Sequence, residues 1–313
     1  MSVAFVFPGQ GSQAVGMGKA LADAYPAARD VFAEVDEALG EPLSCTIWAG
    51  PLDQLTLTEN AQPALMATSL AVIRVLFGNE GSVGGKVAFV AGHSLGEYSA
   101  LAAAGAISLA DTARLLRLRG KAMQVAVPVG QGAMAALLGI DAAGAEKAVV
   151  EAAQGDICQV ANDNDPGQVV ISGTKAAVER AGEIAKKYGA KRAMMLNVSA
   201  PFHCALMQPA ADAMREALVK ITIHKPGVPL IANVVAAAIT EPDDIRRRLV
   251  EQVTATVRWR ESVLEMSRLG VTQVCEIGAG KVLCGLARRI VPGLVVTPVG
   301  SPEDIEAALA ALA

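Results

Sequence analysis

The sequence feature that most constrains the fold is a serine held between two glycines, Gly92-His93-Ser94-Leu95-Gly96, which matches the pattern GxSxG. An apolar run over 87–91 precedes it, and a stretch of small residues through Ala104 follows, so the pattern predicts a strand, a sharp turn and a helix. Such a turn lifts a serine hydroxyl above the edge of a sheet, and its small residues let the strained backbone close. The motif therefore indicates an α/β protein with Ser94 as a nucleophile. The alternative is an ordinary serine in a glycine-rich turn.

Several other segments have clear patterns. A buried strand is expected over 3–7, closed by Pro8-Gly9, and further strands over 228–234 and 272–278. One helix is expected over 17–39. A second should begin with Thr58 as its cap and run to Gly78, before a surface turn over 78–85.

Residues 133–198 have a different rhythm, with strands expected over 133–140, 157–163, 167–173 and 193–198 and helices over 142–153 and 175–189. The order βαββαβ is that of a ferredoxin-like unit. The sequence thus predicts a large α/β hydrolase-like domain with a parallel sheet, formed by residues 1–128 and 199–313, and an inserted ferredoxin-like domain over 129–198.

Composition narrows the class of protein. With 313 residues and 52% hydrophobic content the chain can bury a large core, and its net charge of −4 argues against nucleic acid as a partner. The five cysteines show no metal-ligand spacing, so we expect reduced thiols and no metal. Neither a secretion signal nor an apolar run of the ~18 residues that a membrane span needs is evident. These observations favour a soluble, cytoplasmic protein without a membrane partner.

A serine nucleophile needs a base, and the chain has three histidines, His93, His203 and His224. His93 sits in the strained turn and should project away from Ser94, whereas His224 fits a solvated strand edge. His203 follows the last strand of the inserted unit, where a loop can present it over a cleft. We therefore expect His203 to be the base, the alternative being a structural histidine that caps the next helix. Its sequence neighbours include no acid, so whether a carboxylate completes a triad stays open.

The acyl oxyanion formed by attack on a carbonyl needs hydrogen-bond donors. The Leu95 backbone N–H lies beside Ser94 at the start of the expected helix, where the helix dipole adds to its effect. A second donor is expected from the loop Pro8-Gly9-Gln10-Gly11, because parallel strands end at the same edge of a sheet. This loop could also be a simple tight turn.

Arg119 occupies an unusual place in the helical pattern of residues 110–124. Arg114, Arg117 and Lys121 share one stripe, but Arg119 falls on the side of Leu115 and Met123, which should face the interior. A buried guanidinium is costly unless paired, and its planar fork fits a carboxylate. Its partner is either a structural acid or a substrate carboxylate.

Taken together, these motifs resemble the malonyl-CoA:acyl carrier protein transacylase family, a resemblance that covers nearly the whole chain. The segments that carry it are FPGQGSQ, ENAQPAL, GHSLGEYSAL, RLRG, PFHCALM and EIGAGKVLCGL. The chain is also similar to the acyltransferase domains of polyketide and fatty acid synthases.

The resemblance implies an S-malonyltransferase of fatty acid synthesis that takes malonyl-CoA, releases CoA and acylates the phosphopantetheine thiol of holo acyl carrier protein. It needs no cofactor, and a monomer is expected. By motif, Ser94 would be acylated, His203 would be the base, Arg119 would bind the malonyl carboxylate, and Gln10 and Leu95 would hold the oxyanion. Further roles implied by the family are orientation of the histidine through a backbone carbonyl near Gln252, and substrate contacts from Phe202, Gln62 and Asn162. The bulk of Phe202 is expected to exclude an α-methyl branch.

Two other functions remain as alternatives. A serine thioesterase or esterase would use the same turn with water as the acceptor, and a non-catalytic subunit would only bind a carrier protein. A phosphate-binding loop at Gly278-Ala279-Gly280-Lys281 is disfavoured, because GxxxxGK[ST] spacing is missing. The basic clusters 246–248 and 288–289 are candidates for docking an acidic carrier protein, or else ordinary solvated surface.

Overall fold

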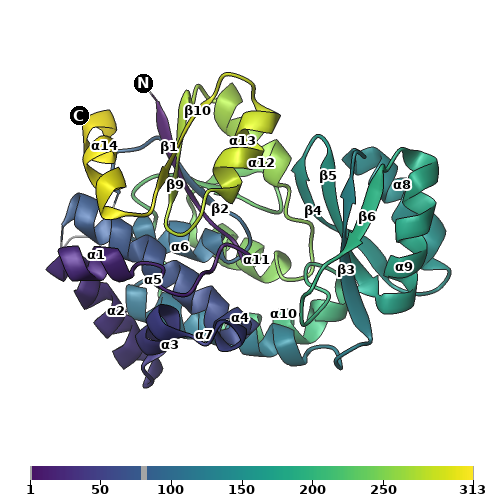
Figure 1. The fold of residues 1–313 in the computed structure, drawn as a ribbon, viewed down its shortest axis with the longest axis horizontal. Helices are drawn as coiled ribbons and strands as arrows, with labels where there is room; N and C mark the ends of the chain where they lie inside the picture. Colours follow the sequence, from purple (N-terminus) through teal and green to yellow (C-terminus); the bar gives the residue numbers. More distant parts are fainter. Residues whose placement is uncertain (1, 79–82, 313) are drawn as a thin grey trace.

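The computed structural model describes residues 2–78 and 83–312, which form two sheets with separate sets of helices (Figure 1). The larger sheet has six strands in the order β10-β9-β1-β2-β7-β8. Every neighbouring pair is parallel except β7 and β8. Its strands are β1 (Val3–Phe7), β2 (Phe89–Gly92), β7 (Leu230–Ala232), β8 (Ala237–Ile239), β9 (Gln273–Ile277) and β10 (Val295–Val299). The predicted α/β class with a mostly parallel sheet is confirmed.

The central strand β1 is buried on both faces, as its uninterrupted apolar sequence predicts. Phe5 and Phe7 join the larger core, whereas Ala4 and Val6 join a smaller core on the opposite face. Helices of the larger core are α1 (Lys19–Ala24), α2 (Pro26–Leu39), α3 (Leu43–Ala49), α4 (Leu52–Thr56), α5 (Thr58–Phe77), α6 (Gly96–Ala103), α7 (Leu109–Val125), α10 (Gln208–Val219), α11 (Pro242–Glu251) and α14 (Pro302–Leu312). The smaller core is covered by α12 (Trp259–Arg268) and α13 (Val282–Ile290).

The second sheet is antiparallel, with the order β4-β5-β3-β6. Its strands are β3 (Gly132–Leu138), β4 (Cys158–Asp165), β5 (Gln168–Thr174) and β6 (Arg192–Met195), and α8 (Ala142–Ala153) and α9 (Lys175–Ile184) pack on it around a separate small core. Figure 1 shows this unit to one side of the larger sheet. The predicted βαββαβ order is confirmed, and the division at residues 128/129 and 198/199 remains a prediction.

The single helix predicted over 17–39 is wrong, because the chain forms α1 and α2 instead. Tyr25 between them is extended, with φ −126° and ψ 115°. Pro26 explains the break, since a proline disfavours the helical conformation of the residue before it and fits the first turn of a new helix.

The predicted cap at Thr58 is also wrong, although α5 does begin there. Leu57 occupies the cap position, and no side chain caps this end of the helix among the residues the structure describes. The Thr58 hydroxyl instead accepts from Gln10 Nε2 at 3.3 Å and lies 3.2 Å from Ser199 Oγ. Residues 79–82 of the predicted surface turn lie outside the described residues.

Other differences concern short elements. The strand predicted over 228–234 is the shorter β7, which pairs with β8 beyond the predicted range, and the strand predicted over 87–91 is β2, which begins at Phe89. The sequence analysis made no prediction for α3, α4, β8, β10 or the helices α11 to α14. The first two are short, and Pro298 lies within β10.

Helix α5 corrects the expectation that no segment has the length and hydropathy of a membrane span. The helix has 20 residues, and an 18-residue stretch within it has a mean hydropathy of 1.2, which passes that test by length and composition. However, 78% of the apolar stretch is buried inside the protein, as in a core helix. The helix is therefore a core helix, whose alanine and leucine side chains pack in the larger hydrophobic core.

Candidate active site

Ser94 lies in the sharp turn between β2 and α6, as the GxSxG pattern predicts. Its φ of 53° is a strained value for a residue with a side chain. A Cβ on Gly92 would come within 1.9 Å of the Gly96 carbonyl carbon, and one on Gly96 would come within 2.2 Å of the Phe7 carbonyl oxygen. Both glycines are therefore required for strand, turn and helix to approach this closely.

Asn233, which sequence reasoning missed, fixes the turn from the neighbouring strand. It follows β7 and is fully buried. Its Oδ1 accepts from the Ser94 backbone N–H at 2.9 Å, and its Nδ2 donates to the Gly92 carbonyl at 2.7 Å. The available signal was a polar residue directly after a buried strand.

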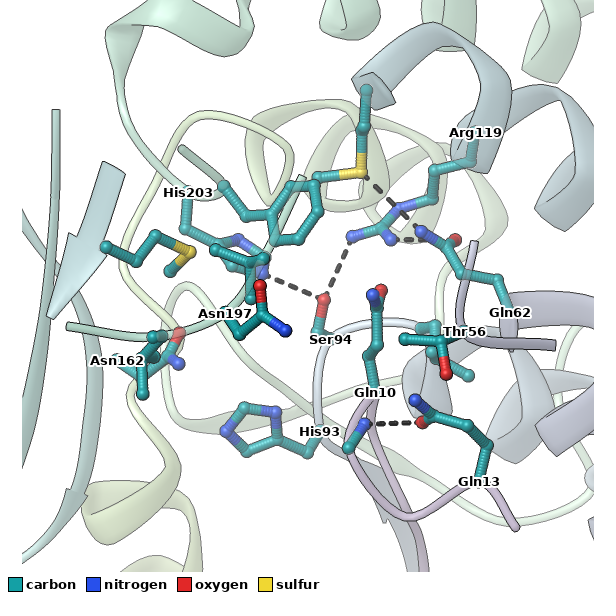
Figure 2. Close-up of a pocket in the computed structure, with 17 residues that line it drawn as sticks. Gln10, Gln13, Thr56, Gln62, His93, Ser94, Arg119, Asn162, Asn197 and His203 are labelled. Atoms are coloured by element: carbon teal, nitrogen blue, oxygen red, sulfur yellow. Dashed lines mark hydrogen bonds between the residues drawn. The ribbon is translucent and has the colours of Figure 1, made fainter. Parts of the chain in front are cut away.

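The serine and a histidine form a hydrogen-bonded pair, since Ser94 Oγ lies 2.8 Å from His203 Nε2 (Figure 2). On the other side of the ring, His203 Nδ1 donates to the Gln252 backbone carbonyl at 2.9 Å. This bond fixes the tautomer that leaves Nε2 free to accept the serine proton. A backbone carbonyl thus occupies the place of the carboxylate that the sequence left open.

Burial and, to a smaller extent, the positive charge of Arg119 lower the pKa of His203 to about 3. The imidazole is therefore neutral at physiological pH and can accept a proton. A neutral ring also costs less to bury than an imidazolium would.

The other two histidines follow the sequence prediction in part: the strand edge predicted for His224 is wrong, because residues 222–226 form neither helix nor strand. His93 turns away from Ser94, and its Nε2 is 3.0 Å from Asn164 Oδ1. His224 is exposed. Neither competes with His203 as the base.

Arg119 is 1% exposed although it belongs to a charged stretch of α7, which confirms the inward direction predicted for it. Its Nη1 donates to Gln62 Oε1 at 2.9 Å, and its Nη2 donates to Gln252 Oε1 at 2.9 Å and to Ser94 Oγ at 3.1 Å. These partners are neutral oxygens, so the predicted alternative of a direct structural acid is not what the structure contains. The guanidinium keeps its charge beside the nucleophile.

A buried carboxylate that sequence reasoning also missed lies beneath this group. Glu97 on α6 is 1% exposed and accepts hydrogen bonds from Gln252 Nε2 and, at 3.3 Å, from the Asn233 backbone N–H. Gln252 Nε2 also donates to the Ser94 carbonyl at 3.0 Å. The sequence signal for Glu97 was its position directly after the GxSxG motif in GHSLGEYSAL.

Two backbone N–H groups are placed to receive a negative oxygen. Leu95 precedes α6, and Gln10 follows β1, which pairs with β2. Within residues 2–78 and 83–312, neither N–H donates to a protein acceptor. Both residues border the same cavity as Ser94.

That cavity has a volume of about 330 Å³ and opens beside Ser94. Figure 2 shows Ser94 near its centre, between His203 and Arg119. All the predicted substrate contacts border it, namely Arg119, Gln62, Asn162 and Phe202. Gln252 is fully buried behind the wall and reaches the site through its hydrogen bonds.

A second cavity of about 260 Å³ adjoins the first. The two share Gln10, Gly11, His93, Asn162 and Leu196 as lining residues, and the second continues toward α13. Together their lining includes Ser94, residues of the smaller sheet and residues of α13.

Across the part of the chain that the structure describes, no three His, Cys, Asp or Glu residues are grouped to hold a metal ion. All five cysteines are free thiols.

The two basic clusters differ in their partners. Arg246, Arg247 and Arg248 each form an ion pair with an acid of the same helix. In the other cluster Arg289 pairs with Asp165 at 2.6 Å. Arg288 donates at 3.5 Å to a backbone carbonyl.

Comparison with known proteins places this geometry in context. Residues 4–288 match the model of the acyl transferase domain family. The chain is 49% identical over 311 residues to the malonyl CoA-acyl carrier protein transacylase of Bacillus subtilis (strain 168), an alignment that spans 99% of this chain and 97% of that protein.

Solved structures agree with this result. The crystal structure of an acyl-carrier-protein-S-malonyltransferase from Bartonella henselae superposes with a TM-score of 0.97 at 58% identity, covering 100% of this chain and 99% of the other. A malonyl-transacylase in complex with its holo type II PKS acyl-carrier protein gives a TM-score of 0.95 at 46% identity, covering 99% and 100%.

Proposed function

The chain belongs to the acyl transferase family and transfers malonyl groups from malonyl-CoA to acyl carrier protein, and we propose that it does so through a malonyl ester of Ser94. The observation that carries this mechanism is the chain of contacts from the Gln252 carbonyl through His203 to Ser94 Oγ, with Arg119 at 3.1 Å from the same oxygen. A nucleophile, its base and a carboxylate-binding cation thus meet in one cavity.

In the first half-reaction, the Ser94 oxygen attacks the thioester carbonyl of malonyl-CoA while His203 Nε2 takes the hydroxyl proton. The carbonyl oxygen becomes negative and is held by the N–H groups of Gln10 and Leu95. When the tetrahedral intermediate collapses, the C–S bond breaks, and His203 returns its proton to the leaving CoA thiolate.

The second half-reaction reverses these steps with a different thiol. The phosphopantetheine thiol of holo carrier protein loses its proton to His203 and attacks the malonyl ester, and the Ser94 oxygen leaves and recovers the proton. The two adjoining cavities suit the narrow pantetheine arm, and Asn162 borders both of them. A ping-pong order follows, because both thiols use the same cavities.

Selectivity for the malonyl group is proposed to come from two side chains. Arg119 would bind the free carboxylate through charge-assisted hydrogen bonds, helped by Gln62, which holds Nη1. Phe202 is 8% exposed and borders the cavity beside His203, where its bulk would crowd an α-methyl branch.

Of the two basic clusters, we favour 288–289 as part of the carrier-protein contact. They end α13, whose residues Val282, Leu283 and Leu286 border the second cavity, and the Arg289 side chain is 56% exposed. The cluster 246–248 is neutralised within its own helix. Charge reversal at Arg289 should raise the KM for carrier protein and leave the KM for malonyl-CoA unchanged.

We also propose that the enzyme works as a monomer in the cytoplasm. One chain supplies every side chain that the mechanism uses, and the five free thiols suit a reducing compartment.

Steady-state kinetics with both substrates test the reaction order. Ping-pong transfer gives parallel double-reciprocal lines as carrier protein and malonyl-CoA are varied, and malonate release without carrier protein should be slow. Intersecting lines would overturn the covalent mechanism. Rapid hydrolysis that carrier protein does not suppress would favour the thioesterase alternative.

A further inference from the structure

Glu97 has no part in the mechanism above, yet it is fully enclosed beneath the nucleophile. Its two oxygens accept from Gln252 Nε2 and from the Asn233 backbone N–H. Burying a carboxylate is costly even when it is hydrogen-bonded, so a neutral residue would be expected here if packing were the sole requirement.

The partner of Glu97, Gln252, contacts every working part of the site. Its backbone carbonyl accepts from His203, its Oε1 accepts from Arg119 Nη2, and its Nε2 donates both to the Ser94 carbonyl and to Glu97. A side-chain amide has a donor end and an acceptor end, and these can exchange by rotation about one bond. If the amide turned over, its oxygen would face the Glu97 carboxylate and its NH2 group would face the Arg119 guanidinium.

An ionised Glu97 excludes that reversed orientation, because it requires a donor opposite it. We propose that Glu97 is a positioning residue that orients the Gln252 amide, and through it presents Arg119 to the carboxylate of the malonyl group. This inference rests on the proposed function of Arg119.

Loss of the Glu97 carboxylate should mainly slow acylation by acyl groups that carry a carboxylate. In the free enzyme Arg119 is held by Gln62, Gln252 and Ser94 Oγ. Once Ser94 Oγ is used in the ester bond, Gln62 and Gln252 remain to hold the guanidinium. A disordered Gln252 amide would then hold Arg119 less firmly and weaken its binding of the malonyl carboxylate. An acetyl group has no carboxylate for Arg119 to bind.

The proposal also predicts a dependence on pH, because burial raises the pKa of Glu97 to about 7. Arg119 from α7 and Tyr98 from its own helix interact electrostatically with Glu97, and His203 from the loop after β6 shares Gln252 with it. The pKa of His203 is about 3 and that of Tyr98 is about 12, so neither titrates near neutrality.

Other elements packed against α6 contribute no group that would titrate together with Glu97 near neutral pH. The strand residues of β1, β2 and β7 include no ionisable side chain. On α5, Glu59 and Arg74 pair with Lys121 and Glu34 respectively.

The test compares single-turnover acylation of Ser94 by malonyl-CoA and by acetyl-CoA in the wild type and in Glu97→Gln. The variant should be acylated by malonyl-CoA about tenfold more slowly, the effect of losing one hydrogen bond to a charged group, and by acetyl-CoA at nearly the wild-type rate. In the wild type, the ratio of the two rates should rise from pH 6 to pH 8 as Glu97 ionises. In Glu97→Gln it should stay constant.

Glu276→Gln is the matched control, since Glu276 is a buried carboxylate that accepts from the backbone N–H groups of Leu283 and Cys284 and does not contact Gln252. This control should keep the wild-type ratio and its pH dependence. If Glu97→Gln does not fold, the wild-type pH series alone decides.

Two results would overturn the proposal. One is an unchanged ratio in Glu97→Gln, which includes an equal slowing with both acyl groups. The other is a wild-type ratio that is constant or falls between pH 6 and pH 8. Failure of the proposed function would look different. In that case the wild type itself would form no malonyl ester on Ser94.

Discussion

Replacing Arg119 with alanine removes a guanidinium that lies 3.1 Å from the nucleophile and leaves the serine, histidine and oxyanion donors in place. A malonyl carboxylate bound by the fork of an arginine gains two charge-assisted hydrogen bonds, each worth about 1.5–3 kcal/mol. Their loss, about 3–6 kcal/mol in total, corresponds to a reduction of roughly 10² to 10⁴ in kcat/KM for malonyl-CoA. An acetyl group forms neither bond.

The structure also predicts how the variant tolerates the change. Removal of the guanidinium leaves two buried acceptors, Gln62 Oε1 and Gln252 Oε1, without the donor they have in the wild type. The adjoining cavity of about 330 Å³ gives water access to this region. We therefore expect a folded protein in which acetyl transfer persists.

The assay is acylation from malonyl-CoA and from acetyl-CoA, measured separately, with Arg117→Ala as the control. Arg117 lies two residues away on α7 but contacts Glu41, Asn60 and the Glu59 carbonyl outside the cavity. Arg117→Ala should keep the wild-type preference. If Arg119→Ala retained the wild-type ratio of malonyl to acetyl acylation, the carboxylate-binding role would be refuted.

Three further predictions concern neighbouring residues. Because the pKa of His203 is lowered to about 3, acylation by acetyl-CoA, which does not depend on Glu97, should lose rate only well below pH 6.5, and an acid limb centred between pH 6 and pH 7 with this substrate would contradict the prediction. The same shift means that the unfolded state binds more protons below pH 6.5, so the free energy of unfolding should decrease as the pH falls from there, which acid-denaturation curves of the wild type and His203→Gln would show. Phe202→Ala should raise kcat/KM for methylmalonyl-CoA relative to malonyl-CoA by about tenfold or more, as competition assays can measure, and an unchanged ratio would exclude Phe202 as the steric barrier. Asn233→Ala removes the buried amide that holds the turn at Ser94 and Gly92. We expect the free energy of unfolding in denaturant titrations to fall by about 2–4 kcal/mol, and acylation by malonyl-CoA and by acetyl-CoA to slow alike. A variant with wild-type stability would show that Asn233 does not fix the turn.

Much of the site was predictable because its chemistry is local in sequence. The glycines around Ser94 have to be small for strand and helix to meet, so GxSxG predicts the turn directly. The inward direction of Arg119 followed from helical periodicity alone, and its burial confirms it.

The residues that were missed act across long sequence separations. Asn233 is 139 residues from Ser94 and Glu97 is 155 from Gln252, and their hydrogen bonds exist because the fold brings β2, β7, α6 and the end of α11 together. The sequence around each gives no sign of its partner. The role of the Gln252 carbonyl was likewise expected from family resemblance alone, since any residue offers such a group.

Errors in the fold have local causes that outweighed periodicity. Pro26 divides a continuous apolar pattern into two helices, and Thr58 contacts Gln10 and Ser199 in place of capping its helix. At Pro26 a backbone constraint overrides the helical pattern. At Thr58 contacts with distant residues replace the helix cap that the sequence predicts.

The most direct test of the central claim is the intact mass of the protein after mixing with malonyl-CoA, for the wild type and for Ser94→Ala. The account predicts a malonyl-sized increase on the wild type, absent from Ser94→Ala and removed when holo carrier protein is added. An adduct that persists in Ser94→Ala, or a wild type that releases CoA and malonate without ever carrying the group, would contradict it.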